Sequence, residues 1–218
     1  MQTNFGFEIP TILEDVCKPN KMALLVYDMQ VGIVAQLPDG AKFIQQVKTV
    51  VDIARTYQLR TFFSRHTTLP NQVAGVSQLR SAMALQQVND VADVKPNFLP
   101  NSPAHEIVPE LAPLSSEVAF DKLKMSAFVG SYLDLALKDV RVEAVAIAGA
   151  VLEFGIEPTV RHAADLGYIP VLLADACYSF SLENKKRSLD SLRSVGIVTD
   201  TLTFKKSGIA SSSKMKFL

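Results

Sequence analysis

Residues 22–28, MALLVYD, form an unbroken apolar run that ends in an aspartate. Such a run is typical of a strand that is buried on both faces of a parallel sheet. Residues 41–57 then carry apolar side chains at helical spacing, and residues 60–64 have the pattern of a second short strand. A strand, a helix and a strand in this order predict a βαβ unit, so we expect a fold of the α/β class.

The same alternation returns in the second half of the chain. The expected strands lie at residues 117–120, 142–148, 168–173 and 197–199, and the expected helices at residues 132–140, 156–166 and 182–195. This order predicts one doubly wound, three-layer α-β-α domain over residues 1–218, with a mostly parallel sheet of about six strands. Residues 208–218, which are rich in serine and lysine, are expected to form a loosely held tail.

Residues 65–113 interrupt this regular pattern. Six prolines divide them into short pieces, and residues 76–91 are the part that could hold a helix. Long connections of this kind usually shape a binding site or a contact between subunits. Together with a net charge of zero, this connection favours a homo-oligomer, either a dimer or a tetramer.

The composition argues against several classes of protein. The 22 basic and 22 acidic residues are dispersed along the chain, which does not favour nucleic-acid binding. No apolar run approaches the roughly 20 residues that a membrane span needs, and residues 1–10 lack the pattern of a secretion signal. We therefore expect a cytoplasmic protein that binds neither nucleic acid nor a membrane. The two cysteines, Cys17 and Cys177, are expected to be buried free thiols.

Polar residues at the ends of the predicted strands are the first candidates for a functional site, because ligands bind there in open α/β sheets. Asp28 ends the first strand, Lys122 follows the third, and residues 149–151 follow the fourth. A carboxylate at the end of an apolar strand is costly unless it is exposed, paired or functional. The alternative interpretations are a turn or capping residue for Asp28 and a surface lysine for Lys122.

Three segments at these strand ends resemble motifs of the isochorismatase-like superfamily, also called the cysteine hydrolases. Residues 24–30, LLVYDMQ, are similar to its opening strand with a D-x-Q ending. Residues 122–128, KLKMSAF, are similar to its K-x-x-x-S-A-F segment, and residues 149–159, GAVLEFGIEPT, to its G-V-x-x-x-x-C-V-x-x-T segment. The resemblance implies that Asp28 is the catalytic acid or base, and Lys122 the catalytic lysine, of a hydrolase with a small-molecule substrate.

Gly155 stands where the resemblance places the nucleophilic cysteine. Glycine has no nucleophile, so the thiol-amidase mechanism of the superfamily does not carry over. Isochorismatases also have glycine here, and their mechanism resembles protonation of a vinyl ether by the aspartate, followed by addition of water. They usually carry a histidine two residues before the glycine, where this chain has Glu153.

Three interpretations of the chain stay open. The first is a hydrolase that applies the acid-base chemistry of Asp28 and Lys122 to water. The second is a homologue that has lost hydrolysis and binds a small molecule or serves as a scaffold. The third is a thiol amidohydrolase whose cysteine has been replaced by Gly155.

The resemblance also implies a cis peptide bond between Ala150 and Val151. The backbone N–H groups of Val151 and Gly155 are then expected to bind a carbonyl oxygen or a carboxylate. The further residues expected around the substrate are Gln30, His66, Phe128 and Glu153. A metal site of the nicotinamidase type needs an aspartate and two histidines, and only Arg65-His66-Thr67 is present in this region. We therefore expect no metal and no other cofactor.

Overall fold

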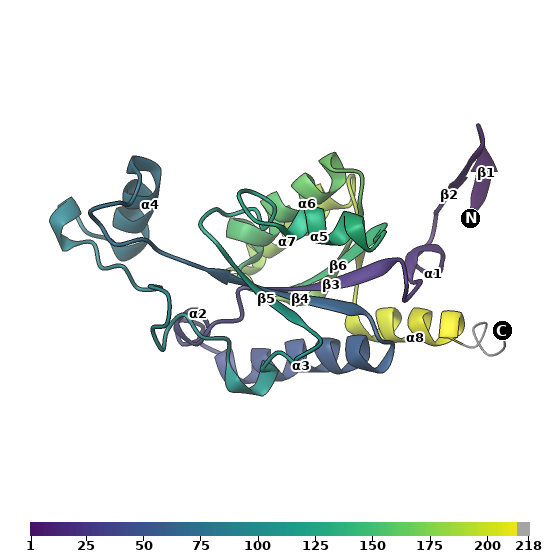
Figure 1. Cartoon of the computed structure of the whole chain (residues 1–218), viewed down its shortest axis with the longest axis horizontal. Coiled ribbons are helices and arrows are strands. Elements are labelled where there is room, and N and C mark those ends of the chain that lie inside the picture. Colours follow the sequence, from purple (N-terminus) through teal and green to yellow (C-terminus); the bar gives the residue numbers. More distant parts are fainter. Residues whose placement is uncertain (213–218) are drawn as a thin grey trace.

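A six-stranded parallel sheet forms the centre of the molecule (Figure 1). The structure is a computed structural model that describes residues 1–212, with side chains described up to residue 207. The strands lie in the order β5-β4-β3-β6-β7-β8, and each neighbouring pair is parallel. Helices α3 and α8 cover one face, while α5, α6 and α7 cover the other (Figure 1). This arrangement confirms the predicted three-layer, doubly wound α/β fold.

The predicted strands and helices all occur. The strands of the sheet are β3 Met22–Tyr27, β4 Arg60–His66, β5 Val118–Lys122, β6 Ala144–Gly149, β7 Ile169–Cys177 and β8 Ile197–Thr199. The main helices are α3 Gly40–Thr56, α4 Val76–Gln86, α5 Leu133–Asp139, α6 Glu157–Asp165, α7 Leu182–Leu192 and α8 Thr201–Ser212. Two short 3-10 turns, η1 Val91–Asp93 and η2 Pro109–Leu111, lie in the long connection between β4 and β5.

The two central strands, β3 and β6, are buried along their whole length. Their residues pair in parallel register from Met22 with Ala144 to Tyr27 with Gly149. Because side chains alternate across a strand, Leu24 and Val26 pack into the core beneath α3, whereas Tyr27 packs into the core beneath α6. The last residue of β3 therefore points into the same layer as the helix that follows β6.

Several N-terminal elements were not predicted. A small antiparallel hairpin of β1 Gln2–Asn4 and β2 Phe7–Ile9 precedes α1 Leu13–Val16, and α2 Val31–Val34 follows β3. These pieces are too short to show a clear hydrophobic period. In Figure 1 the hairpin projects from one end of the molecule, and α4 projects from the other.

The end of the chain also differs from the prediction. Residues 208–212, expected in a loosely held tail, continue helix α8, and the remaining tail residues lie outside the described part of the chain. Phe204 explains the helix, because its side chain is buried in the core shared with α3. Within residues 1–212, no helix has the length and apolar character required to cross a membrane.

Candidate active site

Asp28 lies at the carboxyl end of β3, where its backbone turns sharply with a φ of 48°. A positive φ is uncommon for any residue but glycine and is often found where function requires it. Ser64, on the neighbouring strand β4, donates a hydrogen bond of 2.6 Å from Oγ to Asp28 Oδ1. The Asp28 N–H bonds the Ser64 carbonyl oxygen at 3.2 Å. Ser64 on β4 thus holds both the carboxylate and the backbone of Asp28.

Lys122 reaches the same carboxylate from the end of β5. Its Nζ lies 2.7 Å from Asp28 Oδ2, and the two side chains are only 1% and 5% exposed. Lys122 Nζ also donates to the Lys124 carbonyl oxygen at 3.1 Å and lies 4.4 Å from the centre of the Tyr27 ring. The sequence prediction that Asp28 and Lys122 meet at the strand ends agrees with this geometry. A buried ion pair is costly to form, and charged groups held in this way are common at functional sites.

The segment after Lys122 is held against α6 by side-chain hydrogen bonds. Ser126 Oγ lies 2.9 Å from His162 Nδ1, and the Ala127 N–H donates to Thr159 Oγ1 at 3.1 Å. Phe128, predicted to line the substrate site, instead lies in the core. Its ring stacks on Tyr168 with the ring centres 5.8 Å apart. An apolar ring in this segment gains more from burial between helices than from an exposed pocket wall.

Gly155 lies in a single π-helical turn, η3 Leu152–Ile156, between β6 and α6. The peptide bond between Ala150 and Val151 is cis, as expected. The Gly155 N–H, however, donates to the Val151 carbonyl oxygen at 3.1 Å. The hydrogen bond within this turn therefore occupies one of the two N–H groups that were expected to bind an anion together.

Gln30 is fully buried, and its side-chain amide bonds the backbone. Its Oε1 accepts from the His66 N–H at 2.6 Å, and its Nε2 donates to the carbonyl oxygens of His66 and His105 at 3.0 and 2.9 Å. The amide is fully used in joining the end of β4 to the loop at His105. Gln30 was expected to contact the substrate, but its side-chain amide bonds backbone groups instead.

His66 ends β4 beside the dyad of Asp28 and Lys122. Burial lowers the pKa of His66 below its ordinary value of 6.5, and the charge of Lys122 lowers it further, while Asp28 acts in the opposite direction. The imidazole is therefore mainly neutral near pH 7. Its ring contacts that of Phe98 in the long connection, with the ring centres 5.6 Å apart.

Glu153 serves the structure of the π-helical turn. Its Oε1 accepts from the Phe180 N–H at 3.1 Å, which joins the turn to the loop after β7. Its Oε2 is buried and has no hydrogen-bond partner among the described residues. Glu153 thus shares its turn with Gly155, and its side chain is directed to the loop after β7 by the bond to Phe180.

Tyr27, Ser64 and His162 contact the predicted site residues but were not predicted from the sequence. Tyr27 interrupts an otherwise aliphatic run directly before Asp28, which is the one signal that could have pointed to it. Ser64 and His162 gave no such signal, because a single serine in a strand or histidine in a helix is common.

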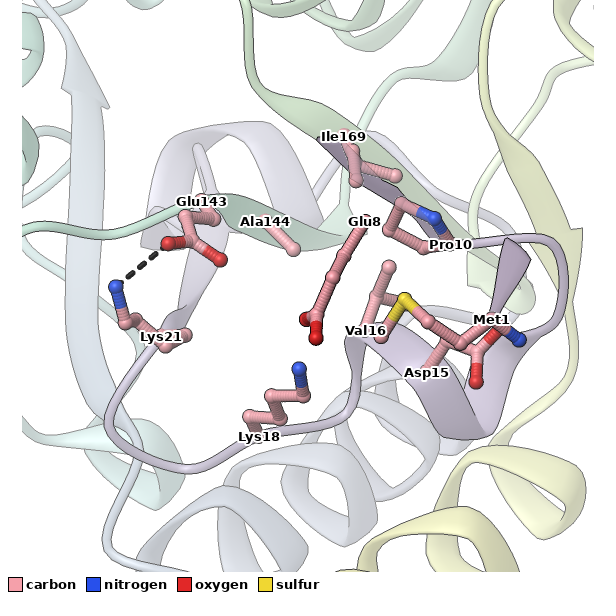
Figure 2. A pocket seen from close by; sticks show the side chains of 10 residues that line it. All are labelled: Met1, Glu8, Pro10, Asp15, Val16, Lys18, Lys21, Glu143, Ala144 and Ile169. Carbon is pink, nitrogen blue, oxygen red and sulfur yellow. Dashed lines mark hydrogen bonds and ion pairs between the residues drawn. The ribbon is translucent and has the colours of Figure 1, made fainter. Parts of the chain in front are cut away.

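A separate cavity of about 250 Å³ lies at the opposite edge of the sheet, near the amino ends of β6 and β7 (Figure 2). Its charged groups are largely paired with one another: Lys21 with Glu143, and the Met1 amino group with Asp15. In Figure 2 the Glu8 and Lys18 side chains point toward each other across it. Residues at amino ends of strands lie far from the dyad, so this cavity is not part of the site. Among residues 1–212, no group of three or more His, Cys, Asp or Glu could hold a metal ion.

The fold and the buried pair of Asp28 and Lys122 define an α/β protein with its candidate site at the carboxyl ends of the strands. The isochorismatase domain model matches residues 22–203, and the chain belongs to that family.

Several known proteins are similar to this chain in sequence or in fold. An uncharacterized isochorismatase family protein of Bacillus subtilis strain 168, YwoC, is 29% identical over 170 residues, which are 78% of this chain and 84% of that protein. The ureidoacrylate amidohydrolase RutB of Caulobacter segnis is 24% identical over 204 residues, covering 86% and 85% of the two chains. The crystal structure of a cysteine hydrolase from Pseudomonas syringae pv. phaseolicola 1448A has a TM-score of 0.72 at 24% identity, covering 89% of this chain and 95% of that one.

Proposed function

We propose that this chain is a hydrolase of a small molecule that uses Asp28 and Lys122 on water and forms no covalent intermediate with the protein. The observation that supports the proposal most is the 2.7 Å pair between these side chains, buried at the carboxyl ends of β3 and β5. Burial of both charges away from water is a cost that a merely structural pair rarely repays. Substrate sites in this fold lie at that edge of the sheet.

The chemistry follows from the two groups. The Asp28 carboxylate accepts a proton from a water molecule while the water oxygen bonds the substrate carbonyl carbon. The Lys122 ammonium stabilises the negative charge that develops on the carbonyl oxygen. The bond from carbon to the leaving nitrogen then breaks, and the proton on Asp28 passes to that nitrogen. No step needs a side chain at Gly155.

The substrate class is proposed from the relatives. Proteins of similar sequence or fold include ureidoacrylate amidohydrolases, a pyrazinamidase of Pyrococcus horikoshii and an N-carbamoylsarcosine amidase of Thermoplasma acidophilum. We therefore propose a small amide or ureido compound. A vinyl ether is the alternative, because glycine at position 155 is also compatible with protonation by the aspartate and addition of water.

The test is a panel of ureidoacrylate, pyrazinamide, N-carbamoylsarcosine and simple vinyl ethers. We expect at least one to be hydrolysed, and Asp28→Asn to lower the rate by about 10²–10⁴ while the fold is kept. Iodoacetamide should leave the rate unchanged, because burial raises the pKa of both Cys17 and Cys177 to about 12. A rate that survives Asp28→Asn, or that iodoacetamide abolishes, would contradict the proposal.

A second candidate is a binding or scaffold protein without turnover. It is favoured by one observation: the dyad is almost closed to solvent, with Asp28 4% and Lys122 3% exposed. In that case no compound of the panel is hydrolysed, but a ligand that fits raises the thermal midpoint of the chain, and Asp28→Asn removes the increase.

The chain is also proposed to form a homo-oligomer, a dimer or a tetramer. Large apolar side chains are exposed on the N-terminal hairpin, where Phe5 is 87% and Phe7 71% exposed. A two-stranded hairpin is only marginally stable by itself, so contact with another chain would stabilise it. Light scattering at micromolar concentration tests the proposal, and a monomer mass would contradict it.

A further inference from the structure

The Tyr27 side chain occupies the space beside Gly155. A Cβ atom built on Gly155 would lie 2.6 Å from Tyr27 Cε1, and closer still to Cζ and to the hydroxyl oxygen. Cβ atoms in proteins essentially never lie less than 3.0 Å from a heavy atom of a residue that is not a chain neighbour. Gly155 does not have a positive φ, so its backbone conformation alone would accept any residue except proline. The lack of space, rather than the backbone conformation, is what requires glycine at this position.

Tyr27 cannot readily turn away from Gly155. Its residue is 2% exposed, and its hydroxyl group donates to the Met125 carbonyl oxygen. Burial and the charge of Asp28 raise the pKa of Tyr27 well above 10, so the hydroxyl stays protonated and keeps this hydrogen bond. The face of its ring lies 4.4 Å from Lys122 Nζ, a contact that stabilises the ammonium group.

The backbone of Tyr27 is equally fixed. Its carbonyl oxygen accepts from the Ala150 N–H at 3.0 Å. It also lies so close to Gly149 that a Cβ atom there would overlap the Tyr27 backbone. The segment before η3 is therefore packed directly on Tyr27, and a larger residue at position 155 could be accepted only by displacing a buried ring.

We infer that Tyr27 takes the place of a nucleophile's side chain, because its phenol ring fills the space beside Gly155. This packing leaves no room for a thiol at position 155. A single replacement of Gly155 by cysteine then cannot create a working thiol site. Two replacements are needed, one of which removes the ring. A thiol amidohydrolase that differed only at position 155 would have kept the room for its cysteine. The inference rests on packing and holds whether or not the chain hydrolyses a substrate.

Thermal unfolding of four chains tests the packing: the unchanged chain, Gly155→Ala, Tyr27→Val and the double variant. Gly155→Ala should lower the midpoint by about 5 °C or more, as overpacking in a domain of this size does. In the Tyr27→Val background, the same change should lower it by less than about 2 °C. Gly75→Ala is the matched control, because nothing lies within 4 Å of a Cβ atom there.

Thiol reactivity gives an independent measurement. Gly155→Cys alone should react with iodoacetamide at least about 10-fold more slowly than the same change combined with Tyr27→Val, in which the thiol has room beside the Lys122 ammonium. The native thiols do not interfere, because both are buried and the pKa of each is raised to about 12. Gly75→Cys, on an exposed loop, supplies the rate of an ordinary accessible thiol.

An unchanged midpoint for Gly155→Ala, or equal alkylation of Gly155→Cys with and without Tyr27→Val, would overturn the inference. If the variants with Tyr27→Val do not fold, Tyr27→Phe replaces them, because it removes the hydroxyl oxygen that lies nearest to the built Cβ atom. Gly155→Ala should then cost less in the Tyr27→Phe background than in the unchanged chain, and an equal loss would also overturn the inference.

Discussion

Ser64 and Asp28 are joined by a 2.6 Å hydrogen bond across two neighbouring strands, from the serine hydroxyl to one carboxylate oxygen. The other oxygen faces Lys122 at 2.7 Å. Because both oxygens are engaged and the residue is 4% exposed, the orientation of the carboxylate is determined by the two partners together.

Ser64→Ala should therefore destabilise the fold as well as the site. Removing the serine hydroxyl leaves a buried carboxylate oxygen of Asp28 without its hydrogen-bond donor, which costs about 1–3 kcal/mol of unfolding free energy. The measurement is urea denaturation. Ser194→Ala is the matched control, since Ser194 is exposed and donates only to a local carbonyl oxygen, and it should change the stability by less than about 0.5 kcal/mol. Equal losses of unfolding free energy for the two variants would show that the hydrogen bond from Ser64 to Asp28 does not stabilise the fold.

Lys122→Met should cost more than the loss of the pair itself. It leaves the Asp28 charge buried without its partner, and breaking a buried pair from one side typically costs about 3–5 kcal/mol. Adding Asp28→Asn removes the uncompensated charge, so the double variant should be more stable than Lys122→Met alone. Chemical denaturation of Lys122→Met, Asp28→Asn and the double variant measures this coupling.

An exposed pair provides the control for this experiment. Lys48 and Asp52 lie 2.7 Å apart on α3 with side chains 39% and 51% exposed. Lys48→Met should cost no more than about 0.5 kcal/mol, because exposed pairs contribute little. If Lys122→Met were as mild, the pair of Asp28 and Lys122 would be better hydrated than its burial indicates.

The stability of the chain should fall as the pH drops below 6.5 because of His66. Burial lowers the pKa of His66 in the folded state below its ordinary value of 6.5. The unfolded chain therefore binds a proton at this residue before the folded chain does, and acid favours unfolding. Thermal midpoints between pH 5 and pH 8 should decrease toward pH 5, and His66→Asn should make this decrease shallower. An unchanged slope in the variant would assign the acid sensitivity to other groups.

The sequence predicted the fold well because the strands of this sheet are buried on both faces. β3 and β6 are therefore continuous apolar runs, and their ends mark the site. It also predicted that Asp28 and Lys122 would meet. The roles of Gln30 and Phe128 were not predictable in the same way. An amide or a ring beside a motif has the same appearance in a sequence whether it faces a substrate or the backbone, and only the packing of distant segments such as residues 105 and 168 decides.

Gln30 provides a direct test of that difference. If its amide holds the backbone, Gln30→Leu leaves the His66 N–H and two carbonyl oxygens without their partner in a fully buried position. The expected loss is about 3 kcal/mol or more of unfolding free energy, or roughly 6–12 °C in the thermal midpoint. Gln36→Leu is the control, because Gln36 is exposed and makes one local bond to the Gly32 carbonyl oxygen. A Gln30→Leu chain with an unchanged midpoint and an altered response to a bound compound would mean that Gln30 faces the substrate after all.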